Sequence, residues 1–384
     1  MNKNINGIMF IFILLTLKLN IEIINCSNLP FQQKNLLINK KTKIKNLNTL
    51  NNFFKKKNLV IGAFVNYSWI KINNFFISLI KAKFDNYDCV MFVGNITQDA
   101  KDKLKLIGVI IYDIPEKYTN YTLQNYRWKL YEDFLKDNRH KYNMVFTTDI
   151  RDSFFQKDIF KYYPSNRSFL GIFIEDAIIK HIYINCIWIK HFAGEENLRK
   201  IYHNRIICSG SLIGTVDKFI ELCHILWKII FDKKDLNTVL DQGALDYIIY
   251  FLHYLNDSII TKDNNGPLLT IALTRRDKIK LDKDDNVYSF DGQIAAVVHQ
   301  YDRHPDIVSK VKKKFNVTSF DVINQLNKTY EKNYIFVVLF FIISFLIILL
   351  YFLFNKKKKK INVHSYENKY REVKIKASKN NTKK

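Results

Sequence analysis

Two aspartates stand at the end of an apolar run in the middle of this 384-residue chain. The run 144–146 leads through two threonines to Asp149 and Asp152, with Arg151 between them, and a second apolar patch follows at Phe154 and Phe155. This pattern predicts a buried strand that ends in carboxylates, at the edge of an open α/β sheet where ligands bind. Two carboxylates there can bind a divalent cation, and a cation can bind a diphosphate. The same spacing also suits a strand-end turn with capping carboxylates.

Strands and helices are predicted to alternate upstream of these aspartates. Continuous apolar runs, typical of central parallel strands, alternate with segments whose apolar residues have helical spacing. The predicted strands are 59–65, 88–93, 108–112 and 142–147, and the predicted helices are 70–83, 97–106 and 123–136. This order predicts βαβ units and a parallel sheet. Right-handed crossovers then place the loops after these strands, including the loop at Asp149, along one edge.

The second half of the chain is less regular and contains further candidate polar residues. Gly210 and Gly214 lie in the stretch 205–215, where backbone without side chains can approach a substrate closely. An apolar helix is predicted at 218–231, and Asp241 with Gln242 opens another helix. A short predicted strand at 295–298 ends in His299. No internal repeat is visible, and one domain of roughly 260 residues suits the pattern.

Taken in this order, the motifs resemble those of glycosyltransferases with the GT-A fold, and of family-8-type transferases in particular. The stretch TDIRDSFFQKD at 148–158 resembles a TD(V/I)RDxxFQxD pattern in a less characterised branch of such enzymes. In family-8-type enzymes the second Asp of an Asp-x-Asp signature is followed six residues later by another Asp, as Asp152 is by Asp158. Asp149 is displaced by one residue from the first position of that signature, and Arg151 is an additional charge.

The resemblance implies a Rossmann-like three-layer α/β/α domain with a mixed, mainly parallel sheet. It also implies that Asp149, Asp152 and the late His299 bind Mn²⁺ or Mg²⁺, with octahedral positions left for phosphate oxygens. Asp241 and Gln242 resemble the pair that begins a helix lining the sugar pocket. Together with Asp152, that pair is the candidate catalytic set.

The resemblance implies a nucleotide site at the same edge. Asn66 and Tyr67 end the first predicted strand, where relatives hold the base and ribose, and Tyr67 could stack on uracil. Three arginines are candidates to contact the diphosphate: Arg127, Arg151 and Arg303. Arg303 suits that role because a planar guanidinium binds phosphate well. The implied donor is a nucleotide sugar, with a UDP-sugar favoured.

The net charge of +24 does not predict a nucleic-acid-binding protein, because most of it belongs to the ends of the chain. Residues 31–57 carry +8 and residues 356–384 carry +10, whereas residues 58–333 carry +5. The globular part therefore lacks the basic face that nucleic acids require. Five cysteines without metal-ligand spacing argue against a structural zinc site, while a disulfide between Cys186 and Cys208 remains open.

Two apolar segments predict a membrane protein of the secretory pathway. The stretch 8–17 is too short to span a bilayer and fits a signal peptide over residues 1–26. The 21 uncharged residues 334–354 are long enough to span a hydrocarbon core of about 30 Å. Five lysines follow at once, and positive charge marks the cytosolic side. Seven Asn-x-Ser/Thr sequons precede this segment, consistent with a lumenal domain.

The predicted organisation is a signal peptide (1–26), an Asn/Lys-rich stem (27–57), a GT-A domain (58–315), a stalk (316–333), a transmembrane helix (334–354) and a basic cytosolic tail (355–384). The predicted function is metal-dependent transfer of a sugar to a glycan or glycoprotein in the ER or Golgi lumen, with a retaining mechanism favoured by resemblance. Two alternatives stay open. One is a catalytically silent GT-A-like membrane protein that binds a partner, and the other is a metal-dependent phosphoesterase.

Overall fold

The computed structural model describes residues 56–118, 121–164, 167–253, 259–315, 342–343 and 345–346. The predicted signal peptide, stalk and basic tail lie outside the described residues, as do nearly all of the stem and of the segment 334–354. Among the residues that are described, no helix has the length and apolar character needed to cross a membrane.

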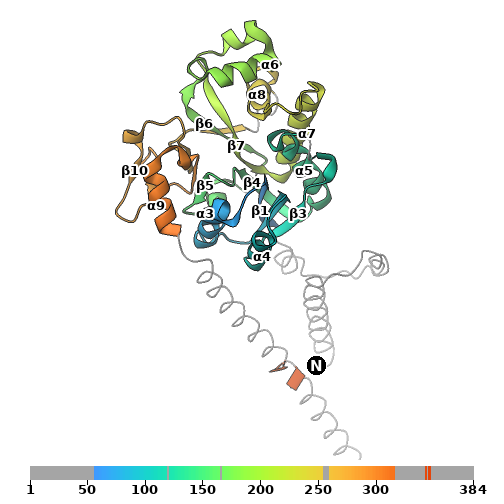
Figure 1. Ribbon diagram of the computed structural model, residues 1–384, viewed down its shortest axis with the longest axis vertical. Coiled ribbons are helices and arrows are strands. Elements are labelled where there is room, and N and C mark those ends of the chain that lie inside the picture. Colours follow the sequence, from blue (N-terminus) through green and yellow to red (C-terminus); the bar gives the residue numbers. More distant parts are fainter. Residues whose placement is uncertain are drawn as a thin grey trace, which may run out of the picture. The chain divides into compact units, whose positions relative to one another are not determined.

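A seven-stranded sheet forms the centre of the described domain (Figure 1), in the order β3-β2-β1-β4-β7-β6-β8. Its strands are β1 (Lys57–Val65), β2 (Tyr87–Gly94), β3 (Ile110–Asp113), β4 (Tyr142–Thr148), β6 (Leu170–Ile178), β7 (Arg205–Thr215) and β8 (Ile259–Lys262). β1 to β4 pair in parallel, and so do β6 and β8. β7 is antiparallel to both of its neighbours, β4 and β6. The predicted mixed, mainly parallel sheet is therefore confirmed.

Helices cover both faces of this sheet. They are α3 (Trp69–Lys81), α4 (Gln98–Leu106), α5 (Leu123–Asn138), α6 (Tyr183–Lys200), α7 (Val216–Asp232), α8 (Asp241–Tyr247) and α9 (Pro305–Phe315). Alternate residues of β1 enter two different cores, as the period of a strand requires. Leu59 and Ile61 pack with α5 and α7, whereas Val60 and Phe64 pack with α3 and α4. Figure 1 shows α3 and α5 on opposite sides of β1, which gives three layers.

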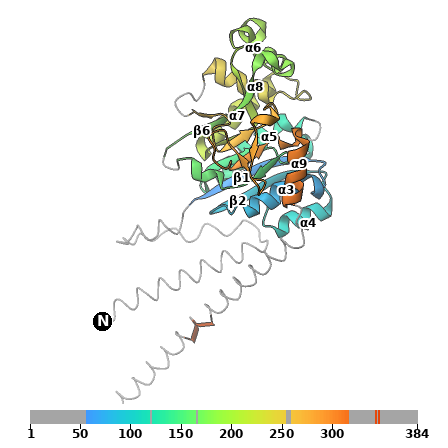
Figure 2. The ribbon, with the colours of Figure 1, turned by 90° about the vertical axis from the view of Figure 1, so that its left-hand side faces the viewer.

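A separate three-stranded sheet, in the order β5-β12-β9, lies beside the large one. It consists of β5 (Ser153–Phe155), β9 (Leu268–Thr270) and β12 (Val297–His299). β12 runs antiparallel to β5, with His299 opposite Ser153, and parallel to β9. Its apolar side packs with α9 and α3 through Phe154, Val298 and Ile307. Figure 2 shows α9 and α3 side by side. The small sheet thus places His299 next to β5, the strand that follows β4 in the chain.

The remaining short elements complete the second half. A two-stranded hairpin is formed by β10 (Lys280–Leu281) and β11 (Val287–Tyr288). Single helical turns are Glu116–Tyr118, Ile159–Tyr162, Ile179–His181, Ile248–Leu252, Arg276–Lys278 and Tyr301–Arg303. Of the larger elements, β6, β7 and α6 were not predicted.

The described cysteines are free thiols, so the Cys186–Cys208 disulfide considered above is wrong. The two sulfurs have other neighbours. Cys186 Sγ donates to the carbonyl oxygen of Ile179 at 3.2 Å. Cys208 Sγ lies 3.5 Å from Nδ1 of His299. Cys186 belongs to α6 and Cys208 to β7, and each sulfur has its own partner.

Candidate metal centre

The loop between β4 and β5 brings Asp149 and Asp152 to one side of the chain. Ile150, between them, is buried and occupies space that Gly62 of β1 leaves open. A Cβ placed on Gly62 would lie only 2.6 Å from Ile150 Cδ1. Arg151 turns outward and is 45% exposed in its side chain. Ile150 is thus fixed in the core and Arg151 points to solvent. The chain bends between the two aspartates, and their carboxylates converge.

The two aspartates meet His299, which the small sheet positions at the end of β12. One potential ligand atom from each of the three residues lies within 4.8 Å of the others. His299 Nε2 lies 3.5 Å from Asp149 Oδ2 and 3.8 Å from Asp152 Oδ1. His299 is fully buried and Asp152 nearly so, whereas the Asp149 side chain is 40% exposed. The cluster therefore opens to solvent on the Asp149 side.

Each carboxylate has one oxygen held by an arginine. Asp149 Oδ1 accepts from Arg127 Nη1 at 2.8 Å, and Asp152 Oδ2 accepts from Arg151 Nη2 at 3.3 Å. The atoms that face the centre are different ones. Neither Asp152 Oδ1 nor His299 Nε2 has a hydrogen-bond partner within the described part of the chain. Buried polar atoms without partners are costly. A divalent cation would satisfy them with two carboxylates and one imidazole, a ligand set that fits Mn²⁺ better than Mg²⁺, which prefers oxygen ligands.

A glycine on the neighbouring strand leaves room for this cluster. A Cβ on Gly210 of β7 would lie 2.6 Å from Asp149 Oδ2 and 2.9 Å from His299 Nε2. Such distances essentially never occur for a real Cβ, so any side chain at position 210 would displace the Asp149 carboxylate and the His299 ring. Beneath the cluster, Thr148 Oγ1 lies 2.8 Å from Ser153 Oγ and 2.7 Å from Ser211 Oγ. These hydroxyl contacts tie β4, β5 and β7 together at the site.

The pKa values of the cluster reflect burial and charge pairing. Burial raises the pKa of Asp149, but Arg127 and His299 lower it by more, and the net shift is downward. Burial raises the pKa of Asp152, and His299 offsets this only in part. For His299, burial lowers the pKa, yet the neighbouring Cys208, Asp149 and Asp152 raise it well above its ordinary value. The two carboxylates therefore favour a positive charge at the centre of the cluster.

Arg127 lies in α5 between two carboxylates. Its Nη1 donates to Asp149, and its Nη2 donates to Asp241 at 2.6 Å and to the carbonyl oxygen of Ser209 at 3.1 Å. The side chain is only 8% exposed. Burial lowers the pKa of Arg127, but Asp241 and Asp149 raise it further, so it stays charged. The residue predicted for the phosphates therefore connects the metal cluster to the start of α8.

Asp241 and Gln242 begin α8 on the other side of this arginine. Asp241 is 2% exposed, and burial raises its pKa while Arg127 opposes the increase. Gln242 is half-buried and lies near Glu175 of β6, which is 4% exposed. Burial raises the pKa of Glu175. Asp241 is thus linked to the metal cluster through Arg127. Glu175 is a further buried acid beside Gln242.

The remaining predicted residues lie at the rim or next to it. Arg151 and Arg303 both pair with Asp302, at 3.1 and 2.8 Å. Tyr67 is half-buried, stacks on Phe64, and has its pKa raised by burial. The charges of Arg151, Asp149, Asp152 and Asp302 also act on its hydroxyl.

Asn66 is exposed at the end of β1, with a left-handed φ of 58°, and accepts from Asn95 Nδ2. Its described contacts lie at the end of β2, and none of them is with the metal cluster.

Asn125 was missed by the sequence analysis although it positions Asp241. It is fully buried in α5, where its Nδ2 donates to the carbonyl oxygens of Leu236 and Thr238 at 3.2 and 2.7 Å. Its Oδ1 accepts from Leu240 N at 3.0 Å. These bonds fasten the loop that enters α8. One Asn in an Asn-rich chain has no sequence signal that would reveal this role.

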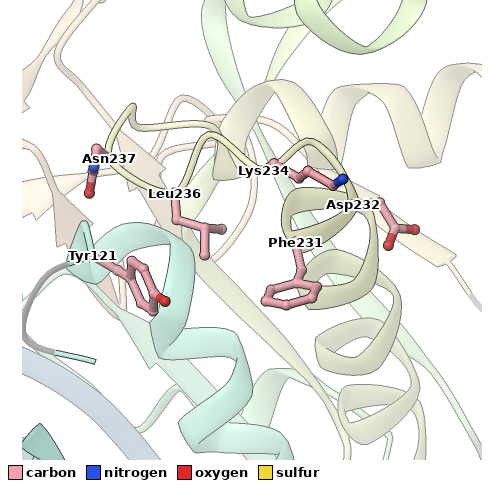
Figure 3. A pocket seen from close by; sticks show the side chains of 6 residues that line it. All are labelled: Tyr121, Phe231, Asp232, Lys234, Leu236 and Asn237. Atoms are coloured by element: carbon pink, nitrogen blue, oxygen red, sulfur yellow. The ribbon is translucent and has the colours of Figure 1, made fainter. Parts of the chain in front are cut away.

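A cavity of about 370 Å³ lies elsewhere in the described domain (Figure 3). Its lining comes from the segment that precedes α5 and from the end of α7 with the loop after it: Tyr121, Phe231, Asp232, Lys234, Leu236 and Asn237. Figure 3 shows the rings of Tyr121 and Phe231 on either side of Leu236. None of these residues belongs to the metal cluster. The chemistry-bearing residues therefore lie outside this cavity.

Comparison with known proteins gives similarity only among solved structures. No family model matches the chain, and no curated protein matches it. A crystal structure of an active-site mutant of LgtC aligns at 11% identity and a TM-score of 0.41, covering 63% of this chain and 86% of LgtC. The galactosyltransferase LgtC in complex with donor and acceptor sugar analogues aligns at 13% and 0.42, covering 69% and 95%. The apo structure of the bifunctional glycosyltransferase WbbM aligns at 13% and 0.44, covering 67% of this chain and 50% of WbbM. Similarity at this level leaves the function to be argued from the chain's own residues.

Proposed function

We propose that the protein is a metal-dependent glycosyltransferase that moves a sugar from a nucleotide-diphosphate donor, with a UDP-sugar favoured, to a glycan or glycoprotein. One observation supports this most strongly. At the carboxyl edge of the parallel sheet, Asp149, Asp152 and His299 converge within 4.8 Å. Two of their inward-facing atoms are without hydrogen-bond partners in the described structure. That edge is where nucleotides bind in α/β sheets.

In this proposal Mn²⁺ or Mg²⁺ bound to the cluster supplies electrostatic stabilisation for the charge that develops on the departing diphosphate. Asp149 and Asp152 each direct one oxygen to the centre, and His299 directs Nε2. Arg151 and Arg303 lie at the solvent side, where each can donate hydrogen bonds to a phosphate after leaving Asp302. Tyr67 is placed to contact the nucleoside.

Asp241 and Gln242 are proposed to contact the transferred sugar, and Arg127 holds Asp241 in place. The Asp241–Arg127 pair at 2.6 Å bears on the mechanism, because a carboxylate that is 2% exposed and held by Arg127 is poorly placed to take a proton from an acceptor hydroxyl. A retaining transferase does not need a strong base, since the departing phosphate can accept the acceptor's proton. The buried pair therefore supports the retaining alternative.

The location of the protein is also a proposal and rests on the sequence. Residues 334–354 would anchor the chain, with the catalytic domain in the ER or Golgi lumen and the lysine-rich tail in the cytosol. The +5 charge of residues 58–333 supports a glycan rather than a nucleic acid as acceptor.

A phosphoesterase is less well supported. Two-metal phosphoesterases need ligands for two ions about 3.5–4 Å apart. Among the described residues, only one group of three or more candidate ligands is found. A silent binding protein would keep the fold without needing the cluster to bind an ion together with a nucleotide.

A thermal-shift titration with Mn²⁺, UDP and GDP tests the proposal. We expect the melting temperature to rise on the order of 5 °C when UDP and Mn²⁺ are both saturating, because binding to the native state alone adds about 2.7 kcal/mol at 100 times Kd. Either one alone should give a much smaller shift. Asp158→Asn is the matched control, because Asp158 belongs to the same segment but not to the cluster. Absence of a joint effect would favour the silent protein. Donor screening with UDP-sugars would then identify the substrate.

A further inference from the structure

Asp302 places a third carboxylate at the rim of the candidate metal centre. It lies in the single helical turn Tyr301–Arg303, which follows His299 closely in the chain. Tyr301 anchors this turn, because its side chain is buried and its N–H donates to the carbonyl oxygen of Asp152 at 3.3 Å. The Asp302 side chain is 26% exposed. The backbone of the metal-binding loop therefore helps to fix where this carboxylate lies.

Two arginines share the Asp302 carboxylate. Arg303 Nη1 donates to both of its oxygens at 2.8 Å, and Arg151 Nη2 lies 3.1 Å from Oδ2. The same nitrogen of Arg151 also donates to Asp152 Oδ2 at 3.3 Å. One guanidinium nitrogen therefore contacts both a carboxylate of the metal cluster and the carboxylate of Asp302.

The arginines at the site differ in how readily a ligand can reach them. The Arg127 side chain is 8% exposed and is paired with two carboxylates beneath the rim. The side chains of Arg151 and Arg303 are 45% and 50% exposed. A diphosphate bound to a cation at the cluster would therefore meet the guanidinium groups of Arg151 and Arg303 first. Both of these groups are paired with Asp302.

A carboxylate and a phosphate compete for a guanidinium group, because both are anions that accept hydrogen bonds from the same N–H donors. A diphosphate that binds Arg151 and Arg303 must either displace Asp302 or remain beside its negative charge. Two like charges repel more strongly where water is partly excluded. Displacement and repulsion each lower the affinity for the nucleotide.

We propose that Asp302 is an internal competitor of the nucleoside diphosphate. Its carboxylate pairs with Arg151 and Arg303, gives way when the diphosphate binds, and returns to the two arginines as the diphosphate leaves. The inference rests on the proposed function, because it concerns the nucleotide affinity of the same site. The contact keeps the nucleoside diphosphate weakly bound and so favours its release after sugar transfer.

The test uses the full chain and calorimetric titration with UDP at saturating Mn²⁺. We expect Asp302→Asn to bind UDP about 3–10-fold more tightly, since two partly exposed ion pairs no longer oppose the ligand and each is worth up to about fivefold. Asp302→Ala should show a gain in the same direction. Asp306→Asn is the matched control, because Asp306 accepts from Arg276 Nη2 at 2.6 Å and its loss changes the net charge equally. Its UDP affinity should stay unchanged.

The gain should also depend on the arginines. In an Arg303→Met background, Asp302→Asn should increase UDP affinity less than it does in the unmodified chain. Damage to the fold would weaken binding, so tighter binding is a readout that a merely structural role of Asp302 does not produce.

Two results would overturn the inference and leave the proposed function intact. One is UDP binding by both Asp302 variants that is no tighter than that of the unmodified chain. The other is an equal gain in Asp306→Asn, which would assign the effect to net charge. If no variant binds UDP, inorganic pyrophosphate with Mn²⁺ is the second probe. Tighter pyrophosphate binding by Asp302→Asn would then support the competition and reject the nucleotide, whereas equal or absent binding would reject both.

Discussion

In the segment that follows β4, residues 149–152 and residues 156–158 differ in how their polar atoms are used. In the first group each aspartate pairs one oxygen with an arginine and turns the other toward His299. In the second group the side-chain atoms bond to backbone. Gln156 Nε2 donates to the carbonyl oxygens of Val287 and Ala295 at 3.0 and 2.9 Å, and its Oε1 accepts from Val287 N at 2.9 Å.

Asp158 belongs to the second group as well. Its Oδ1 accepts from Phe160 N at 3.0 Å, which caps a helical turn, and its Oδ2 accepts from Asp85 N at 3.2 Å. The motif TDIRDSFFQKD therefore has two parts. Residues 149–152 form its chemical half, which could bind a ligand, and residues 156–158 form its structural half, which bonds to backbone. Which half a residue belongs to follows from whether its polar atoms already have protein partners.

The largest expected effect is that of Asp152→Asn. We expect sugar transfer to fall at least about a thousandfold, since loss of the ion removes several kcal/mol of charge stabilisation and 1.36 kcal/mol is tenfold. The metal-free protein should melt at an unchanged or higher temperature. Burial raises the pKa of Asp152, so its charged form costs stability at neutral pH and the neutral amide removes that cost. Donor turnover and calorimetric melting measure the two effects. Full activity would assign Asp152 to the structural half.

Arg127→Met should have the next largest effect, this time on the fold. The substitution leaves Asp241, which is 2% exposed, as a buried charge without its cation. We expect the free energy of unfolding to fall by about 3 kcal/mol, the low end for a broken buried pair, because Asp149 is partly exposed. Urea denaturation measures the change, with Arg127→Lys as the milder variant. A loss under about 1 kcal/mol would mean that Arg127 is not what holds α8 to the cluster.

Gly210→Ala should weaken metal binding without touching a ligand. The added methyl group would lie 2.6 Å from Asp149 Oδ2, so the carboxylate and His299 must separate. We expect Mn²⁺ affinity to fall about 10–100-fold, the range seen when ligand orientation is disturbed. Gly171→Ala is the matched control, since its Cβ would be as crowded, 2.6 Å from Ile213 Cγ2, but by an apolar neighbour. Equal Mn²⁺ affinities in the two variants would contradict the prediction.

Gln156→Ala should give the smallest effect. In contrast to Gly210→Ala, it should lower stability and leave Mn²⁺ affinity unchanged. It removes three hydrogen bonds to backbone atoms of Val287 and Ala295. We expect the free energy of unfolding to fall by about 1–2 kcal/mol, because these groups are only partly buried. Mn²⁺ affinity should stay within about threefold, which is less than 1 kcal/mol. A larger loss of affinity would show that the two halves of the motif are not separable.

The first half of the fold could be predicted from sequence because its strands β1, β2 and β4 are buried on both faces and all its connections are local. The predicted strand 142–147 is β4 (Tyr142–Thr148), and the predicted helix 123–136 is α5 (Leu123–Asn138). In the second half β7 pairs with β4 and β6 in antiparallel register, and β12 pairs with β5. Those pairings depend on residues far apart in the chain, which periodicity within a window does not report.

The candidate site shows the same division. Residue type and strand-end position selected Asp149 and Asp152, and the resemblance to family-8-type transferases added His299; the structure brings the three together. Partners were not predictable. Arg127 was expected at the phosphates and lies between two carboxylates, and Cys208 was considered for a disulfide and lies at His299. A side chain's partner is a tertiary property, and a charge or a thiol on its own does not specify it.

The pairing of β12 with β5 has a consequence for biosynthesis. His299 follows Asp152 by 147 residues, yet the strands that present them are adjacent. While the ribosome is still translating the region before residue 299, the two aspartates have no imidazole beside them. Closing so long a segment costs chain entropy that only the late strand can offset. Binding of the proposed ion would thus come late in the maturation of this domain, and a chain that ends before residue 299 would contain the acidic motif without the histidine of the cluster.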